Sequence, residues 1–422
     1  MITKLDYGKD GINIELPDKI TTIIEPTFLP GIPDPIGAIK NAIRNPIGTL
    51  PLKKLVKPNQ TVGISVCDIT RPMPTSTVLP VLLKELEHIP NEQITIFIAT
   101  GTHRANTASE LDLMLGINIR NKYNIINHDA FNEKDLELAG KTSNNIPIWL
   151  NKKWINNDIK ITTGFVEPHF FAGFSGGPKM VAPGLAGFKT IMGLHSSKMI
   201  SNPNSTWGIT FGNPIHDSIR EIAKINKVDF SIDVSINRDH QITSIYAGEL
   251  FTIHKACSDF VKHISMKPLS KRFPIILTSN SGYPLDLNLY QAVKGISAAA
   301  QVVEEKGSIL CVAECKDGIP SHGKFKQILE SRDTPEGLLE MINSDKYESH
   351  DQWQVQILAQ IMTKANISFM SENIKDQDII SSHMSPITNL EKTLDEKIKE
   401  YGKGSQILVL PQGPQTIPYI YN

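Results

Sequence analysis

The most informative part of the sequence is the glycine-rich stretch Gly164-Phe-Val-Glu-Pro-His-Phe-Phe-Ala-Gly-Phe-Ser-Gly-Gly-Pro-Lys179. Residues 159–166 are rich in β-branched side chains and predict a strand, and seven glycines follow between Gly164 and His195. Glycine permits positive φ and a close approach of backbone to a ligand. A strand that leads into such a loop indicates a cofactor cradle, and the alternative is a flexible connector.

Three side chains on or beside this loop carry reactive groups. His169, Lys179 and His195 supply proton-transfer, nucleophilic and metal-binding chemistry. Each also has a plainer interpretation, since His169 stands among phenylalanines as a core histidine would, and most lysines are solvated. The local sequence leaves both interpretations open.

Strands alternate with helices on both sides of the loop, which is typical of an α/β protein with mainly parallel sheets. In the first half, strands are predicted at 61–67, 93–100 and 123–126, and Thr107 with Glu110 forms a capping box at the start of a helix. In the second half, strands are predicted at 275–279, 308–312, 367–370 and 406–410, and a helix from Asp286 onward. We therefore predict two α/β domains, 1–268 and 269–422, each with a mainly parallel sheet flanked by helices.

Length and composition are those of an ordinary globular protein. The chain has 422 residues, 21% of them charged, and a net charge of −1, which gives no electrostatic footprint for nucleic acid or a membrane surface. No apolar run is long enough for a membrane helix, and the N-terminus lacks a signal-peptide core. Four cysteines are too few for a disulfide framework, and Cys311 with Cys315 makes a weak zinc candidate. We expect a cytoplasmic protein.

Distinctive residues follow several predicted strands, where ligands gather in α/β sheets. Asp68 and Arg71 follow the first strand, His103 the second, and Gln291 and Lys294 lie one helical turn apart after a strand of the second domain. Taken singly, these are typical of a turn closed by a surface arginine, a helix cap and a helix surface. Taken together they predict one site, which we expect in the cleft between the domains.

The combination resembles the nickel-pincer lactate racemases. The likeness covers most of the chain, in order, and the individual motifs gain their specificity from occurring together. They are Asp68-Ile-Thr-Arg-Pro72, Ala99-Thr-Gly-Thr-His-Arg104, Glu167 to Lys179, Pro183-Gly184, Lys189-Thr-Ile-Met192 with His195, Gly282-Tyr-Pro-Leu-Asp286, Tyr290-Gln-Ala-Val-Lys-Gly295, Asp351-Gln-Trp353 and Lys392-Thr-Leu-Asp395.

The resemblance implies a nickel ion in a pyridinium-based pincer mononucleotide that carries two thiocarboxylic groups. Lys179 matches the lysine that tethers this cofactor covalently, and His195 matches the histidine that completes the square-planar nickel site, a geometry that suits soft sulfur and imidazole donors. The segment that holds the nucleotide matches Asp68, Ile69, Thr70 and Arg71. The partners implied are proteins that synthesise and mature the cofactor.

The resemblance also implies the reaction, which is racemisation or epimerisation at C2 of a 2-hydroxy acid. The α-hydrogen leaves as hydride to the pincer, and the planar 2-keto acid takes it back on either face. His103 and His169 match the pair of general bases, a task that suits the ordinary pKa of histidine. Gln291 and Lys294 match substrate-binding residues, and Tyr290 and Trp353 line the same pocket.

The sequence departs from the lactate enzymes beside these residues. Ile69 replaces a common histidine, Thr102 a bulkier residue, and Pro178 and Met180 flank Lys179 in place of other neighbours. Because Thr102 is smaller than the residue it replaces, we expect room in the pocket for a longer or more polar acid than lactate. Alternatives are therefore a sugar-acid 2-epimerase with the same cofactor, or a nickel or nucleotide carrier without turnover. The sequence lacks the cluster of carboxylate and histidine ligands with recognisable spacing that an ordinary metal hydrolase needs.

Overall fold

The computed structural model describes residues 1–321 and 323–421, which form two compact units. Unit 1 contains Met1–Thr27, Ser196–Asn202 and the chain from His263 onward, and unit 2 contains Phe28–His195 and Pro203–Lys262. Each unit therefore draws on separate parts of the sequence. The predicted boundary between two folding domains, 1–268 and 269–422, stays a prediction.

The main sheet of unit 2 has six strands among the described residues, in the order β13-β12-β9-β4-β5-β6. All neighbours pair in parallel except β12 and β13. The strand order reverses between β4 and β9, which is where open α/β sheets form ligand sites. The strands are β4 (Val62–Cys67), β5 (Ile94–Ala99), β6 (Asn124–Asn127), β9 (Ile159–Phe165), β12 (Phe230–Ile236) and β13 (Ile242–Gly248).

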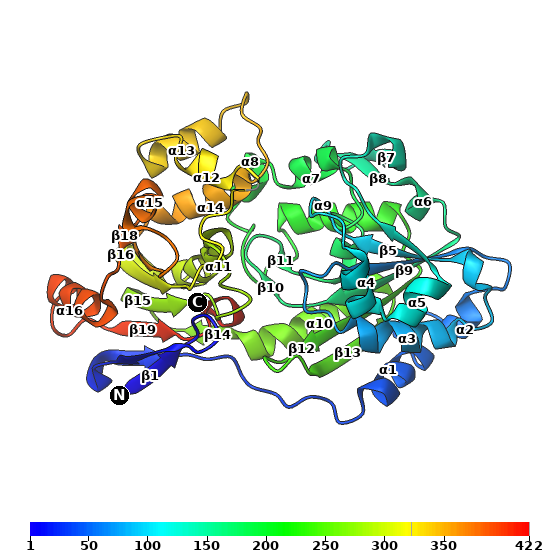
Figure 1. Cartoon of the computed structure of the whole chain (residues 1–422), viewed down its shortest axis with the longest axis horizontal. Helices are drawn as coiled ribbons and strands as arrows, with labels where there is room; N and C mark the ends of the chain where they lie inside the picture. Colours follow the sequence, from blue (N-terminus) through cyan, green and yellow to red (C-terminus); the bar gives the residue numbers. More distant parts are fainter. Residues whose placement is uncertain (322, 422) are drawn as a thin grey trace. The chain divides into compact units, whose positions relative to one another are not determined.

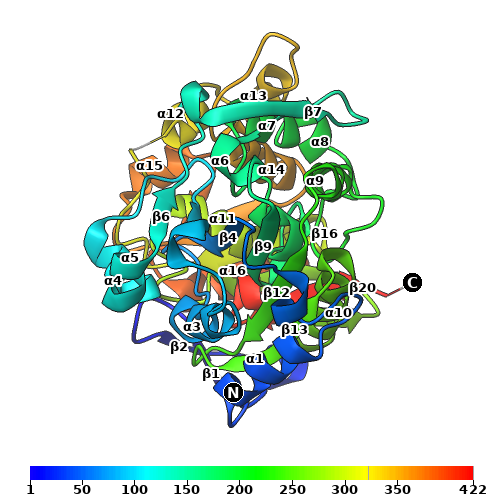
Figure 2. The ribbon, with the colours of Figure 1, turned by 90° about the vertical axis from the view of Figure 1, so that its right-hand side faces the viewer.

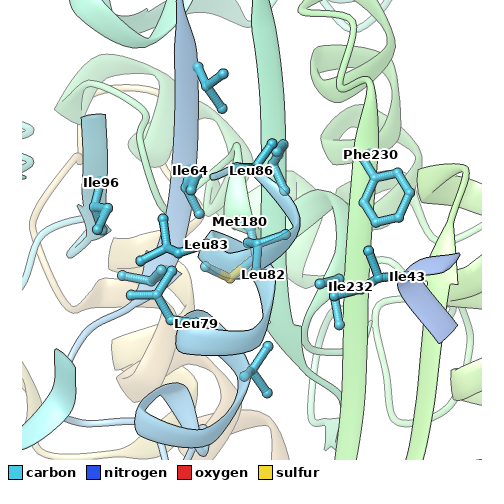
Figure 3. Packing of buried hydrophobic residues seen from close by; sticks show 14 of the residues in the cluster. Ile43, Ile64, Leu79, Leu82, Leu83, Leu86, Ile96, Met180, Phe230 and Ile232 are labelled. Atoms are coloured by element: carbon cyan, nitrogen blue, oxygen red, sulfur yellow. The ribbon is translucent and has the colours of Figure 1, made fainter. Parts of the chain in front are cut away.

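Helices α1 (Pro35–Arg44) and α3 (Thr75–Glu85) lie side by side and close the core of unit 2 (Figures 1 and 2). Figure 3 shows leucines of α3 against isoleucines of β4, β5 and β12, with Met180 among them. Met180 follows Lys179 in the glycine-rich loop. The side chain of Met180 therefore anchors the loop in the hydrophobic core next to Lys179.

The remaining elements of unit 2 surround this sheet. The glycine-rich loop contains the short pair β10 (Pro168–His169) and β11 (Gly173–Phe174) and a 3₁₀ turn, η4 (Gly177–Met180). The others are α2 (Leu52–Leu55), η2 (Asn91–Gln93), α4 (Ala108–Leu115), α5 (Ile117–Lys122), η3 (Glu133–Asp135), β7 (Leu136–Lys141), β8 (Pro147–Asn151), α6 (Lys152–Ile155), α7 (Phe188–Leu194), α9 (Pro214–Ile225) and α10 (Leu250–Ser265), whose last residues pass into unit 1.

Unit 1 contains a second six-stranded sheet, in the order β18-β17-β16-β15-β19-β3 among the described residues, and every pairing is parallel. The strands are β3 (Thr21–Ile23), β15 (Phe273–Ser279), β16 (Val303–Val312), β17 (Asn366–Met370), β18 (Ser385–Pro386) and β19 (Ile407–Leu410). The predicted class, two α/β parts with mainly parallel sheets flanked by helices, is confirmed.

The helices of unit 1 are α8 (Ser197–Ile200), α11 (Leu289–Ala300), α12 (Phe325–Leu329), α13 (Pro335–Ile342), α14 (Gln352–Met362), α15 (Asp376–Ser381) and α16 (Leu390–Tyr401). Smaller elements are β1 (Ile2–Leu5), β2 (Ile12–Glu15), η1 (Asp18–Ile20), β14 (Met266–Leu269), η5 (Gly413–Gln415) and β20 (Ile417–Ile420). In the part of the chain that the structure covers, no helix combines the length and apolar character needed to span a membrane.

The helix predicted from Asp286 onward begins later, at Leu289, because Asn288 is its N-cap. The Asn288 side chain accepts a hydrogen bond from the Gln291 N–H at 3.1 Å. Asp286 is instead a buried carboxylate outside the helix. Its Oδ2 accepts hydrogen bonds from the backbone N–H groups of Gly8 and Glu314 at 2.7 and 2.9 Å.

Candidate active site

The residues predicted for cofactor and catalysis in unit 2 follow the carboxyl ends of its three central strands. Asp68 follows β4, His103 follows β5, and the loop with His169 and Lys179 follows β9. Because β4 and β9 flank the reversal of strand order, these segments meet at the edge where α/β proteins bind ligands.

Hydrogen bonds join these segments to one another. The Gly101 N–H, two residues before His103, donates to the Gly184 carbonyl at 3.0 Å. The Ser65 hydroxyl on β4 donates to the Met180 carbonyl at 2.8 Å. The His103 segment and strand β4 are thus both bonded to the loop that carries Lys179.

Asp68 and His103 form a hydrogen-bonded pair. Oδ2 of Asp68 lies 2.9 Å from Nδ1 of His103, and the Thr70 hydroxyl donates to both carboxylate oxygens at 2.9 and 3.0 Å. Asp68 is 4% exposed whereas the His103 side chain is 44% exposed. The carboxylate is therefore buried behind an imidazole that remains open to solvent.

The electrostatics favour an ionised carboxylate at Asp68. Burial acts to raise its pKa, but the hydrogen bond and charge of His103, the charge of Arg71 and the Thr70 hydroxyl together lower the pKa below its usual value. An ionised Asp68 accepts a hydrogen bond from the Nδ1–H of His103. This bond fixes the Nδ1–H tautomer and directs Nε2 outward. This is the arrangement of an oriented general base.

Phe171 brings the other predicted residues together. Its ring centre lies 4.5 Å from that of His169 and 5.1 Å from that of His195, both edge to face, and 5.7 Å from the Lys179 Nζ. The proposed base, the proposed nickel ligand and the proposed tethering lysine thus surround one aromatic ring. Sequence reasoning noted Phe171 only as a neighbour of His169.

His195 lies at the end of α7 and is 8% exposed. Its Nδ1 is 2.7 Å from the Ile191 carbonyl, and because a carbonyl only accepts, Nδ1 carries the proton. Nε2 is then the nitrogen with a lone pair, as in metal-binding histidines whose other N–H bonds to a carbonyl. Among the residues described, no group of three or more His, Cys, Asp and Glu side chains forms a complete metal site.

Three glycines in and beside the loop are required by close packing. A Cβ added at Gly164 would lie 2.2 Å from Asp233, one at Gly173 2.2 Å from the Ile209 carbonyl oxygen, and one at Gly177 2.3 Å from the His254 ring. These positions need glycine because other parts of the protein pack against them. The cofactor cradle itself stays a prediction.

Four polar side chains beneath the loop were missed by sequence reasoning. They are Asn213, His216, Asp233 and His254, and each bonds to the loop backbone. Asp233 is the charged residue in a strand whose other side chains are uncharged and mostly apolar. A carboxylate in such a strand was a usable sequence signal. The other three carry no local signal because their partners lie tens of residues away in the chain.

The predicted substrate-binding residues lie in unit 1. Gln291 and Lys294 are one turn apart on α11 and so share a face of that helix. The Trp353 Nε1–H donates to the Tyr290 hydroxyl at 3.2 Å, and the Gln354 side chain donates to the Tyr290 carbonyl. Helices α11 and α14 thus hold Tyr290 and Trp353 together.

Mainly parallel sheets with polar side chains gathered after their strands are typical of α/β enzymes. Family models support this class and narrow it. Residues 7–208 match the lactate racemase N-terminal domain, and residues 270–417 match the lactate racemase C-terminal domain.

Individual relatives agree with the family models. The chain is 34% identical to the lactate racemase of Lactiplantibacillus plantarum over 377 residues, 89% of each chain. It is 32% identical to that of Thermoanaerobacterium thermosaccharolyticum over 420 residues, 98% of each chain. The chain belongs to the lactate racemase family, and with it to the isomerases.

Solved structures show the same relationship. The lactate racemase apoprotein from Thermoanaerobacterium thermosaccharolyticum matches with a TM-score of 0.93 at 31% identity, covering 99% of this chain and 100% of that one. A protein from Thermotoga maritima matches with a TM-score of 0.69 at 17% identity, covering 93% and 100%. The second likeness concerns the fold alone.

Proposed function

We propose that this protein racemises or epimerises C2 of a small 2-hydroxy acid, with lactate as the first substrate to test. The observation that carries the proposal is the buried Asp68 carboxylate bonded to Nδ1 of the exposed His103. A carrier or store of nickel or nucleotide needs no oriented base. The pair therefore favours a catalyst over a binding protein.

His103 acts in this proposal as one of two general acid–base groups. With Nδ1–H held by Asp68, Nε2 takes the hydroxyl proton of one enantiomer and returns it to the product. Asp68 stabilises the imidazolium that forms in between. His169, after β9, performs the same task for the opposite enantiomer.

The strand order supports two bases on opposite sides. His103 follows β5 and His169 follows β9, and β4 lies between these strands. Two strand spacings are about 10 Å, which leaves room for a small acid between the two loops. A racemase needs this symmetry because each enantiomer presents its hydroxyl and α-hydrogen in mirror-related positions.

The residues of unit 2 fit the cofactor that the family resemblance implies. Lys179 and His195 lie around the same Phe171 ring, and His195 has the protonation pattern of a metal ligand. In the proposal, Lys179 tethers the nickel-pincer nucleotide, His195 binds its nickel, and residues 68–71 hold its nucleotide. When bound, the cofactor accepts and returns the α-hydrogen of the acid as hydride.

The residues proposed for the substrate carboxylate are Lys294 and Gln291. A desolvated carboxylate needs a cationic partner and further donors, which an ammonium and an amide supply. Tyr290 and Trp353, joined by their hydrogen bond, would form an amphipathic wall beside it. Thr102, next to His103, is proposed to set how large an acid is accepted.

The compartment is also a proposal. All four cysteines are buried free thiols. This supports a reducing location such as the cytoplasm, where proteins for cofactor synthesis would mature the enzyme.

The decisive test uses protein produced together with the cofactor-synthesis proteins. We expect about one nickel per chain, a covalent mass increase on Lys179, and interconversion of D- and L-lactate. His103→Gln and His169→Gln should keep nickel and adduct but lose about 10²–10⁴-fold in rate. Lys179→Ala should lose the adduct.

Two outcomes would overturn parts of this proposal. A matured protein with neither nickel nor adduct would remove the cofactor assignment. Loaded protein that racemises no 2-hydroxy acid, including lactate, malate, aromatic lactates and aldonic acids, would return the carrier interpretation. Activity on aldonic acids but not on lactate would instead assign a sugar-acid 2-epimerase.

A further inference from the structure

The underside of the glycine-rich loop rests on four buried polar side chains from three distant elements, which we name the anchor cluster: Asn213, His216, Asp233 and His254. Asn213 precedes α9 and His216 lies within it, Asp233 lies on β12, and His254 lies on α10. They are between 0% and 4% exposed. The sequence motifs of the family resemblance include none of them.

Each member of the anchor cluster bonds to a different residue of the loop backbone. The Asn213 amide donates to the Phe171 carbonyl, Nδ1 of His216 to the Ala172 carbonyl, and Nε2 of His254 to the Ser175 carbonyl, each at 2.9 Å. The Gly177 N–H donates to Oδ1 of Asp233 at 3.0 Å. The loop is thus held at four points between His169 and Lys179.

The anchor cluster is tightly packed against the loop and carries little charge. The His216 and His254 rings stack with centres 5.4 Å apart. Burial lowers the pKa of His254 to about 4 and the pKa of His216 well below its usual value, and the charges of Lys179 and Arg220 lower both further. Both rings are therefore neutral at neutral pH, and each donates through the nitrogen that the loop carbonyl selects.

We infer that the anchor cluster positions Phe171 and Lys179, and that its histidines act through one specific nitrogen each. The reason is geometric. The anchor bonds fix backbone groups of residues 171, 172, 175 and 177, the segment that carries the Phe171 ring and leads to Lys179. If a carbonyl bond is lost, the Phe171 ring loses its fixed place and Lys179 with it. These are positioning residues, since none is placed against substrate or cofactor.

The test uses the difference in reach between asparagine and glutamine. The Asn amide nitrogen occupies the place of a histidine Nδ1, and the Gln amide nitrogen that of Nε2. His216→Asn and His254→Gln should therefore keep their loop bonds. The swapped changes His216→Gln and His254→Asn should break them, although polarity is the same and size is similar.

The first readout is made on the apoprotein and needs no activity. Hydrogen exchange of residues 170–180 should quicken about five- to hundredfold in the two swapped variants, since each leaves a buried carbonyl without its donor. Pulse acylation of Lys179 with acetic anhydride, relative to exposed Lys84, should rise several-fold. The matched variants should stay within about twofold of wild type, and exchange of β5 should be unchanged in all four.

The second readout uses enzyme matured with the cofactor and rests on the proposed function. The swapped variants should form less of the Lys179 adduct and show a lower kcat, and the matched variants should restore both. The apoprotein results stand alone, so failure of the proposed function would not be mistaken for failure of this inference. Equal effects of Asn and Gln at either histidine, or no change in exchange and acylation, would overturn it.

Discussion

At the scale of single residues, Asp68 has a contact that sequence reasoning did not predict. The resemblance places it with the segment that holds the nucleotide, and in the structure its carboxylate lies 2.9 Å from Nδ1 of His103. This contact follows from burial, because a carboxylate that is 4% exposed needs hydrogen-bond donors, and His103 and Thr70 provide them.

The first prediction concerns this pair. Asp68→Asn should lower kcat by about 10²–10⁴-fold, because an amide that donates to Nδ1 selects the wrong tautomer of His103. Steady-state racemisation kinetics on nickel-loaded protein measure the effect. Thr70→Val removes the hydroxyl that bonds to Asp68 and lies 3.4 Å from Nδ1 of His103, but it leaves the carboxylate in place; it is the control and should cost much less. An unchanged kcat in Asp68→Asn would return Asp68 to nucleotide binding alone.

The second prediction concerns Asp233. Burial raises its pKa to about 7. Between its usual value of 3.8 and about 7 the folded protein binds the extra proton, so Asp233 destabilises the fold progressively as pH rises through this window. Asp233→Asn should therefore gain about 1–4 kcal/mol relative to wild type between pH 5 and pH 8.5.

Urea unfolding at the two pH values measures this difference. Exposed Asp239→Asn is the matched control and should show no growth of the difference with pH. A stability difference between Asp233→Asn and wild type that is constant with pH would show that Asp233 ionises normally in the folded protein.

At the scale of elements, the sequence located most elements but not all of their starts, since the strand predicted at 308–312 begins earlier, at Val303 of β16. The predicted strands 61–67 and 159–166 correspond to β4 and β9 within one residue at each end. The capping box of Thr107 and Glu110 is present at α4. The start of α11 was placed too early because the deciding group is a side chain, that of Asn288, which accepts the Gln291 N–H.

The third prediction concerns this cap. Asn288→Ala should lower the free energy of unfolding by about 0.5–2 kcal/mol and raise KM, because the first turn of α11 carries Gln291. Asn288→Asp keeps an acceptor for the same N–H and should recover most of the loss. Chemical denaturation and racemisation kinetics test both. A higher KM with unchanged stability would mean that Asn288 contacts substrate directly.

At the scale of the whole molecule, buried histidines and the buried Asp233 shift the stability in opposite directions as the pH falls. Burial lowers the pKa of His128, of His216 and of His254, the last to about 4. Below the usual value of 6.5 the histidines of the unfolded chain bind protons that those of the folded chain do not, so the histidine contribution to stability falls as pH drops from 6.5 toward 4. The Asp68 carboxylate, whose pKa is lowered, adds stability above about 3.8 that is lost only as pH falls further.

The fourth prediction isolates one of these histidines. His254→Gln keeps the bond to the loop but cannot titrate, so it should lose less stability than wild type between pH 7 and pH 4.5. The difference should approach roughly 3 kcal/mol near pH 4, from a shift of about 2.5 pH units. Urea midpoints at several pH values provide the measurement. Parallel curves for the two proteins would show that His254 titrates normally when folded.

The sequence by itself determined the alternation of strands and helices, the positions of Asp68, His103 and His169 after strands, and the position of Lys179 in the glycine-rich loop. These follow from local patterns, since hydrophobic periodicity and turn residues act over a few neighbours along the chain. The tertiary structure alone decided which of these residues touch.

It also decided that β3 near the N-terminus completes the sheet of unit 1, and that Asp233 and His254 support a loop more than fifty residues away. The physical reason is that such contacts depend on how whole elements pack, and each partner taken alone satisfies its local rules without revealing the other.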